Sequence, residues 1–207
     1  MERQPEKKES TIPKRKQILD AALTVFSRKG YGEATIPDIA QEAGVAVGTI
    51  YNYYQGKRHL LISIIEAFVI TEPFKKLLEH PPEADDVSFF SSMIKERLEF
   101  GTGNLNRFFF LFSEVQRNPE LRQQYTEQIF RPIMKYIQKY LNSRISSGAF
   151  RPVNTTVMSR LLPAMVIGLV LLFQIEGENG PLQSVSRQEM ADELLNFILG
   201  GLRRKDG

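Results

Sequence analysis

A short stretch near the N-terminus, residues 35–57, collects side chains that are suited to binding an anionic polymer. Hydroxyl and ammonium groups donate hydrogen bonds to phosphate oxygens, and such contacts position a protein on a nucleic acid without reading its sequence. These groups belong to Thr35, Thr49, Tyr51, Tyr53 and Lys57. The chemistry that this stretch could perform is therefore binding to phosphate groups.

Catalytic and metal-binding chemistry has little support in the sequence. The chain has no cysteine and two histidines, His59 and His80, and neither has a second ligand at metal-binding spacing. The sequence contains neither a phosphate-binding glycine loop nor a nucleophile elbow. We therefore expect no enzymatic activity, no metal site and no cofactor. The lack of cysteine fits a reducing cytoplasm, and the charged N-terminus lacks the apolar segment of a secretion signal.

Three helices, expected at residues 14–29, 36–43 and 46–53, would position these side chains. The first has apolar residues at helical spacing, which form one face. Thr35 can cap the second helix, and Gly44 can end it because glycine adopts the left-handed conformation of a sharp corner. The third helix follows within two residues. This arrangement predicts a helix-turn-helix, whose last helix can enter the major groove of DNA.

The same stretch resembles the N-terminal signature of the tetracycline-repressor (TetR) family in unbroken register. The matching positions are Gly30-Tyr31, Thr35, Asp38-Ile39-Ala40, Ala43-Gly44-Val45, Gly48-Thr49-Ile50-Tyr51, Tyr53-Tyr54, Lys57 and Leu60-Leu61. The resemblance implies a cytoplasmic, homodimeric transcriptional repressor that binds a palindromic double-stranded DNA operator. It also implies that Thr35, Tyr51 and Lys57 bind phosphate, whereas Tyr54 lies in the core.

Base reading would belong to the third helix. Val47 suits a thymine methyl group, Asn52 can pair with adenine, and Gly48 would let the backbone approach DNA. The candidate base-reading residues are Ala46, Val47, Thr49 and Asn52. The chain departs from the family pattern at Ala46, where a Ser or Thr cap is usual, and this costs the helix about 1 kcal/mol. Arg58 replaces a usually acidic residue, and we expect it to add positive charge near the DNA.

The whole chain is expected to be all-α. We predict a flexible basic arm at residues 1–13, a TetR-type helix-turn-helix domain at residues 14–57, and an effector-binding and dimerisation domain at residues 58–207. The net charge of +3 arises in residues 1–60, which contain 10 basic and 7 acidic residues. The C-terminal helices are expected at residues 57–79, 86–101, 104–117, 119–147, 155–176 and 186–203.

The last two predicted helices carry the apolar surface that could join two copies of the chain. Residues 155–176 are apolar on more than one face, which predicts burial on several sides, and residues 186–203 have a single apolar stripe. This pattern favours half of an intermolecular four-helix bundle, with an intramolecular core as the alternative. The apolar run Leu161–Ile175 is shorter than the roughly 20 residues of a membrane span, so we expect no membrane association.

The middle of the chain is rich in aromatic residues. Four phenylalanines within residues 108–112 cannot all face one side of a helix, so some must line another surface or a cavity. Together with the resemblance, this predicts an effector pocket for a large, mainly apolar ligand. The residues assigned to this pocket are Phe89, Met93, Phe108, Phe109, Phe112, Phe130, Met134 and Met165.

The residues do not determine the class of the effector or how the protein responds to it. The segment Glu114–Arg122 is similar to that of family members that sense fatty acyl-CoA, and a drug-like or bile-salt-like molecule is the alternative. Bound ligand would move the helix that begins near Lys57, with a coupling free energy of about 1 to 3 kcal/mol. A regulator that binds DNA independently of ligand, and a helical small-molecule-binding protein or enzyme, are the other candidates.

Overall fold

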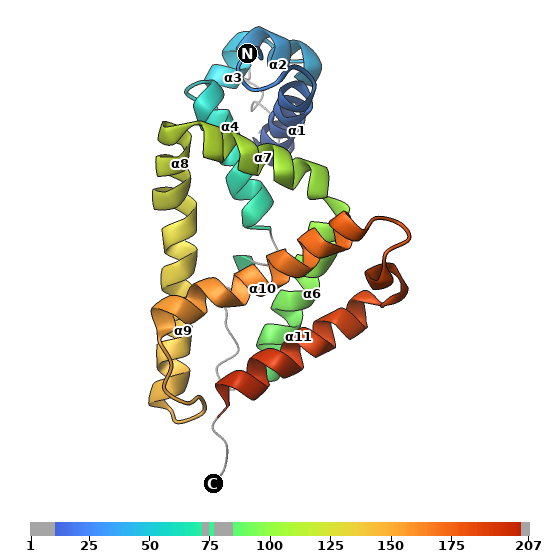
Figure 1. The fold of residues 1–207 in the computed structure, drawn as a ribbon. Coiled ribbons are helices and arrows are strands. Elements are labelled where there is room, and N and C mark those ends of the chain that lie inside the picture. Colours follow the sequence, from blue (N-terminus) through green and yellow to red (C-terminus); the bar gives the residue numbers. More distant parts are fainter. Residues whose placement is uncertain (1–10, 72–74, 77–84, 204–207) are drawn as a thin grey trace, which may run out of the picture. The chain divides into compact units, whose positions relative to one another are not determined.

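The structure is a computed structural model that describes residues 11–71, 75–76 and 85–203. Within these ranges the elements are helices, and an isolated antiparallel bridge joins Phe150 to Arg203. The predicted all-α fold is confirmed (Figure 1). The chain divides into two compact units. The N-terminal unit comprises residues up to Val69 together with Glu114–Arg122, and the C-terminal unit comprises Ile70–Ser113 and the residues from Gln123 onward.

The N-terminal unit contains the predicted tri-helical arrangement. Its helices are α1 (Thr11–Lys29), α2 (Ile36–Ala43), α3 (Val47–Tyr51) and α4 (Lys57–Val69). The prediction of a flexible arm is wrong for residues 11–13, which form the first turn of α1. Pro13 is tolerated there because the first amides of a helix have no helical acceptor. The rest of the predicted arm, residues 1–10, lies outside the described residues.

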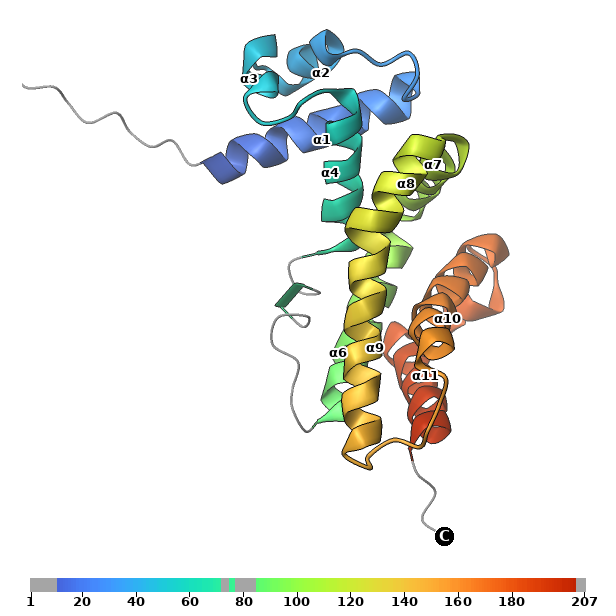
Figure 2. The same ribbon diagram turned by 90° about the vertical axis from the view of Figure 1, so that its left-hand side faces the viewer.

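Apolar side chains from all four helices form the core of the N-terminal unit. α1 packs against both α2 and α4, as Figures 1 and 2 show. The predicted apolar face of α1 is confirmed, because it supplies half of the fully buried side chains of these helices. These side chains are Ile18, Ala22, Val25, Phe26, Ile39, Ile50, Leu60 and Leu61.

The end of the N-terminal unit differs from the predicted domain boundary at residue 57. The helix predicted at residues 57–79 ends at Val69. The whole of the observed helix, α4, belongs to the N-terminal unit. The physical reason is its apolar side, which is buried in the unit and packs on α1. Residues 72–74 and 77–79 of the predicted helix lie outside the described residues.

The rest of the chain forms a series of longer helices. They are α6 (Asp86–Gly103), α7 (Leu105–Arg117), α8 (Pro119–Tyr125), α9 (Arg131–Ser146), α10 (Thr155–Glu176) and α11 (Arg187–Leu202). The helix predicted at residues 119–147 is interrupted by a π-helical turn, η1 (Thr126–Phe130), in which the Arg131 N–H donates to the Thr126 carbonyl oxygen. Pro132 lies two residues after the end of this turn, and its missing N–H favours a widened turn at that point.

A partly buried hydrogen-bond network joins the start of α6 to the end of α9. The Tyr140 hydroxyl donates to Asp86 Oδ1 at 2.6 Å, and Arg144 Nη2 donates to Asp86 Oδ2 at 2.7 Å. The ring of Phe89 stacks on that of Tyr140, with centroids 4.4 Å apart. Burial, followed by the hydrogen bond to Asp86, raises the pKa of Tyr140. The network therefore keeps Tyr140 as a neutral donor that holds the two helices together.

In the single chain α10 is buried on one face, and the prediction that residues 155–176 are buried on several sides, which includes a partner copy, stays a prediction. α10 packs on α6 and α9, and α11 packs on α6 (Figure 2). These neighbours cover one face of α10, which carries Leu162, Val166 and Val170. The other sides leave large apolar residues exposed, namely Val157, Leu161, Ile167, Leu172 and Ile175. The predicted stripe of α11 is also divided, since Met190 and Ile198 are buried but Phe197 is 73% exposed.

By length and composition, α10 is apolar enough to cross a membrane, with a mean hydropathy of 2.0. The expectation of no membrane association therefore depends on how the helix is packed rather than on its composition. In the structure α10 is one of the packed helices of the C-terminal unit, with Ser159 and three apolar residues buried. The expectation stays a prediction.

Candidate DNA-binding interface

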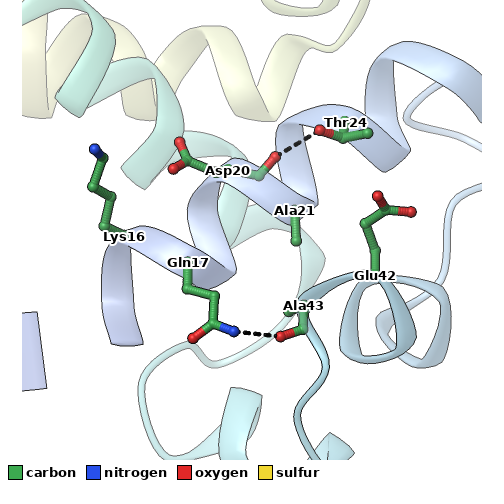
Figure 3. A pocket seen from close by; sticks show the side chains of 7 residues that line it. All are labelled: Lys16, Gln17, Asp20, Ala21, Thr24, Glu42 and Ala43. Carbon is green, nitrogen blue, oxygen red and sulfur yellow. Dashed lines mark hydrogen bonds between the residues drawn. The ribbon is translucent and has the colours of Figure 1, made fainter. Parts of the chain in front are cut away.

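The corner between α2 and α3 is built from local backbone interactions and one contact from α1. Gly44 has a φ of 62°, a left-handed conformation that glycine adopts without steric cost. The Val45 N–H donates to the Ala40 carbonyl oxygen at 3.0 Å. From α1, Gln17 Nε2 donates to the Ala43 carbonyl oxygen at 2.7 Å (Figure 3). Carbonyl groups that the end of a helix leaves without partners are thereby satisfied, and α1 holds the corner.

α3 presents most of its surface to solvent. Ile50 is its one buried side chain and anchors the helix to the core. Val47 is 38% exposed and Tyr51 is 56% exposed. The other residues predicted to contact DNA from this segment are exposed or half-buried: Ala46, Gly48, Thr49, Asn52 and Tyr53. As predicted, Ala46 gives α3 no side-chain cap, and Tyr54 is a core residue that is 2% exposed.

Thr35 caps α2, and its hydroxyl group bonds to Asp38. The Asp38 N–H donates to Thr35 Oγ1 at 3.3 Å, while the Thr35 hydroxyl and N–H donate to Asp38 Oδ2 at 2.8 and 3.0 Å. Lys29 Nζ donates to Asp38 Oδ1 at 2.7 Å. The hydrogen bond from Lys29, followed by those from Thr35, lowers the pKa of Asp38 to about 2. The predicted phosphate contact of Thr35 stays a prediction, and its hydroxyl proton is already directed at Asp38.

Lys57 lies at the start of α4, and its ammonium group has partners inside the unit. Nζ donates to the carbonyl oxygens of Gly32 at 2.8 Å and Ala34 at 3.0 Å. It also lies 4.7 Å from the centroid of the Tyr31 ring. Lys57 therefore ties α4 to the loop between α1 and α2, a role that no pattern in the sequence signals because the acceptors are backbone carbonyls. Its predicted phosphate contact would use the remaining N–H and stays a prediction.

Arg58 has a partner that sequence reasoning missed. Its guanidinium group forms an ion pair with Glu120 at the start of α8. Glu120 lies in the segment Glu114–Arg122, which comprises the last turn of α7 and the start of α8 and belongs to the N-terminal unit. A carboxylate therefore lies beside Arg58 within the unit, and the expectation that Arg58 adds positive charge near the DNA stays a prediction.

An open groove lies between α1 and α2 beside the corner (Figure 3). Arg28 pairs with one of its acidic residues, Glu42, at 3.1 Å. Across the described ranges, no three His, Asp or Glu residues lie close enough to hold a metal ion. The groove is lined by charged, polar and small residues, and we assign it no ligand. These residues are Lys16, Gln17, Asp20, Ala21, Thr24, Glu42 and Ala43.

The residues predicted to line an effector pocket lie on helices of the C-terminal unit and differ widely in exposure. Phe89 and Met134 are buried, whereas Phe109 and Phe112 are 42% and 51% exposed. The rings of Phe108 and Phe112 stack, with centroids 5.9 Å apart. The half-buried members are Met93, Phe108, Phe130 and Met165. That all eight residues line one pocket stays a prediction.

The N-terminal unit defines a class of protein. A capped second helix, a glycine corner and an exposed third helix on two supporting helices form a DNA-binding helix-turn-helix. The family model described as bacterial regulatory proteins, tetR family, matches residues 18–64. The fatty acid metabolism regulator protein of Bacillus subtilis is 31% identical over 67% of this chain and 72% of that protein. The chain belongs to the TetR family of bacterial transcriptional regulators.

Further comparisons show how far the likeness extends. The HTH-type transcriptional repressor KstR of Mycolicibacterium smegmatis is 34% identical over 57% of this chain, and the match spans about half of that protein, 51%. The structure of the transcriptional regulator FadR from Bacillus subtilis in complex with stearoyl-CoA has a TM-score of 0.68 at 24% identity. That alignment covers 90% of this chain and 98% of FadR. The C-terminal unit therefore shares the helical fold of regulators of this family.

Proposed function

We propose that the chain is a homodimeric repressor that binds a palindromic operator through α3 and releases it when a large apolar or amphipathic effector binds. The observation that carries the proposal is the surface of α3, where Ile50 is buried while Val47 and Tyr51 are exposed. A five-residue helix anchored by one side chain gains little stability from these exposed groups, so they are free for a partner. Family membership makes that partner DNA, and a DNA target supports a cytoplasmic location.

The proposed contacts follow from the chemistry of each exposed group. Val47 would contact a thymine methyl group, Asn52 would pair with adenine, and the Tyr51 hydroxyl would donate to a phosphate oxygen. The small residues Ala46 and Gly48 would let the backbone of α3 approach the floor of the groove. Further contacts would come from Thr35, Thr49, Tyr53 and Lys57.

A second copy of the chain would supply the second half of the operator contact. The apolar residues that α10 and α11 leave in solvent, with Leu172 51% and Phe197 73% exposed, support a four-helix dimer interface. A two-fold dimer would present its two α3 helices to half-sites spaced by about 34 Å or a multiple of it. This spacing makes a palindromic operator part of the proposal.

The proposed effector is a long-chain fatty acyl-CoA. The support is the fold shared with FadR, whose structure contains stearoyl-CoA, and the similarity to a fatty acid metabolism regulator. The aromatic residues of α6, α7 and η1 supply the apolar surface that an acyl chain requires. A drug-like apolar molecule is the other candidate, and it is separated from the first by experiment.

The test begins with selection of an operator from random double-stranded DNA by the purified full-length protein. Operator affinity is then measured alone and with stearoyl-CoA, free coenzyme A or an uncharged apolar compound, against scrambled DNA as the control. We expect stearoyl-CoA to reduce affinity by 5- to 150-fold and coenzyme A to have no effect. Release by the uncharged compound alone would indicate a drug-like effector. Binding that no compound changes would indicate a ligand-independent regulator, and absence of selective binding would overturn the proposal.

A further inference from the structure

The corner between α7 and α8 belongs to the DNA-binding unit although the chain on both sides of it belongs to the other unit. Residues up to Ser113 and from Gln123 are part of the C-terminal unit, whereas Glu114–Arg122 is part of the N-terminal unit. Val115 and Leu121 in this corner are 4% and 0% exposed. α7 and α8 therefore each carry a continuous backbone from one unit into the other.

The corner is locally rigid. The Asn118 side chain caps α8, because its Oδ1 accepts the N–H groups of Glu120 and Leu121 at 3.1 Å. The Asn118 N–H also donates to the Glu114 carbonyl oxygen at 3.1 Å, which closes the last turn of α7. A displacement of either helix would consequently move Glu120 together with the corner.

Within the DNA-binding unit, Glu120 forms an ion pair with Arg58 of α4, and this ion pair is open to solvent. The Arg58 and Glu120 side chains are 50% and 66% exposed. Exposed ion pairs contribute little to stability, so this pair can break and re-form without unfolding the unit. Burial raises the pKa of Tyr31, and the charges of Arg58, Glu114 and Glu120 also act on it. Tyr31 therefore lies within the electric field of the ion pair.

From Tyr31 and Arg58 the contacts lead to the loop that precedes α2. The Tyr31 ring packs edge-on against that of Phe26, with centroids 5.3 Å apart, and faces the Lys57 ammonium at 4.7 Å. Lys57 is the residue before Arg58 and holds the carbonyl oxygens of Gly32 and Ala34. The first two residues of α4 thus contact two different segments. Lys57 binds the loop before α2, and Arg58 binds the corner between α7 and α8.

We infer that the Arg58–Glu120 ion pair is the releasable contact through which the C-terminal unit controls the placement of α3. The inference rests on the proposed function and names its regulatory contact. The pair holds the DNA-binding arrangement, and an effector that displaces α7 or α8 breaks it. A ligand changes a conformational equilibrium only through an interaction that differs between the two states, and this pair is such an interaction.

The first experiment measures the stearoyl-CoA concentration that releases half of the bound operator from the full-length protein. We expect Arg58→Ala and Glu120→Ala each to lower this concentration by about two- to five-fold, the range of an exposed ion pair. The charge exchange, Arg58→Glu with Glu120→Arg, should restore it. The matched control is Arg131→Ala, which removes a similarly exposed ion pair with Glu127, 2.7 Å long, within the C-terminal unit.

A direct DNA contact by Arg58 predicts a different pattern. Arg58→Ala would then weaken operator binding and flatten its salt dependence by about one unit of slope, whereas Glu120→Ala would strengthen binding. That opposite behaviour of the two variants would overturn the inference. Equal effects of Arg58→Ala and the Arg131→Ala control, or a charge exchange that restores nothing, would also overturn it.

Amide hydrogen exchange decides the inference even if stearoyl-CoA is the wrong effector, because it needs neither DNA nor ligand. In Glu120→Ala we expect residues 31–35 to exchange about two- to five-fold faster than in the unsubstituted protein, together with residues 116–122. Arg131→Ala should change neither segment. Faster exchange confined to residues 116–122 would show that the pair does not control the loop before α2. Failure of operator selection with this long-range effect intact would count against the proposed function alone.

Discussion

In the N-terminal unit, the polar groups of Thr35 and Lys57 have partners inside the unit, whereas in the C-terminal unit α10 and α11 expose large apolar side chains. Thr35 bonds to Asp38, and Lys57 bonds to two backbone carbonyls. On α10 and α11, by contrast, Ile175 and Phe197 are about three-quarters exposed. The first surface is supported by directional hydrogen bonds. The second surface exposes apolar area that a partner can bury. These are the properties that groove reading and subunit association respectively require.

The difference also concerns how each surface tolerates change. A contact with a base edge is lost when a side chain is displaced by about an ångström, because hydrogen bonds weaken steeply with geometry. Burial of apolar area is not directional, so the α10–α11 surface tolerates small displacements. We therefore expect substitutions that disturb the support of α3 to affect DNA binding strongly, and substitutions on α10 and α11 to act only through lost apolar area or an introduced charge.

The largest expected effect comes from the anchor of α3. Ile50→Ala removes a fully buried side chain and should lower the free energy of unfolding by about 2 to 5 kcal/mol. The measurement is urea unfolding of the full-length protein followed by circular dichroism. Val47→Ala on the same helix is the control. It should change stability by less than about 1 kcal/mol but still weaken operator binding. Equal losses of stability in the two variants would contradict the proposed division of roles on α3.

The next largest effect should appear on the exposed apolar surface of α10 and α11. Phe197→Glu places a charge where we propose that two copies meet, and desolvating it should weaken dimerisation by at least about tenfold. Analytical ultracentrifugation over a concentration series measures this effect. Asn196→Glu adds the same charge at a neighbouring exposed position of α11 and serves as the control. If both variants remain dimeric at the same concentrations, the proposed interface is elsewhere.

The fold could be predicted from the sequence where a local pattern determines the structure. The apolar spacing in α1, the Thr35 cap and the Gly44 corner each depend on residues within one helix turn of each other, and all three are present. The end of α4 and the partial exposure of the apolar stripe on α11 were not predicted correctly. Both depend on which distant helix covers an apolar face, and hydrophobic spacing within one segment does not contain that information.

The candidate site shows the same limit at the level of single residues. The exposed residues of α3 were predicted because a five-residue helix with one anchor exposes its other positions. The partners of Arg58 and Lys57 were not predicted, since Glu120 is far away in the sequence and the carbonyls of Gly32 and Ala34 carry no residue identity. Polar contacts of this kind are visible only once the fold brings the segments together.

A smaller effect should separate the two roles of Lys57. Lys57→Ala leaves two carbonyl oxygens without their donor and should lower the free energy of unfolding by about 1 kcal/mol. If its remaining N–H binds phosphate, operator affinity should also fall for all sequences, with a salt dependence flattened by about one unit of slope. We expect both effects. Tyr51→Phe, which removes one neutral donor, is the comparison and should weaken binding without changing the slope. An unchanged slope in Lys57→Ala would assign the ammonium to the loop alone.

The smallest effect concerns the acid behaviour of the cap of α2. The pKa of Asp38 is lowered to about 2 from an ordinary value of 3.8, mainly by the hydrogen bond from Lys29 and then by those from Thr35. Because the pKa is lower in the folded chain, the ionised carboxylate stabilises the fold above about pH 4, and this contribution is lost as the pH falls towards 2.

Asp38→Asn removes the ionisable group. The difference in unfolding free energy between the two proteins should therefore be constant above about pH 4 and shrink below it. Urea unfolding at a series of pH values measures this difference, with Asp20→Asn on the exposed side of α1 as the control. A difference that does not change with pH would show that the cap acts through hydrogen bonding alone, so that the charge of Asp38 contributes nothing to the stability of the fold.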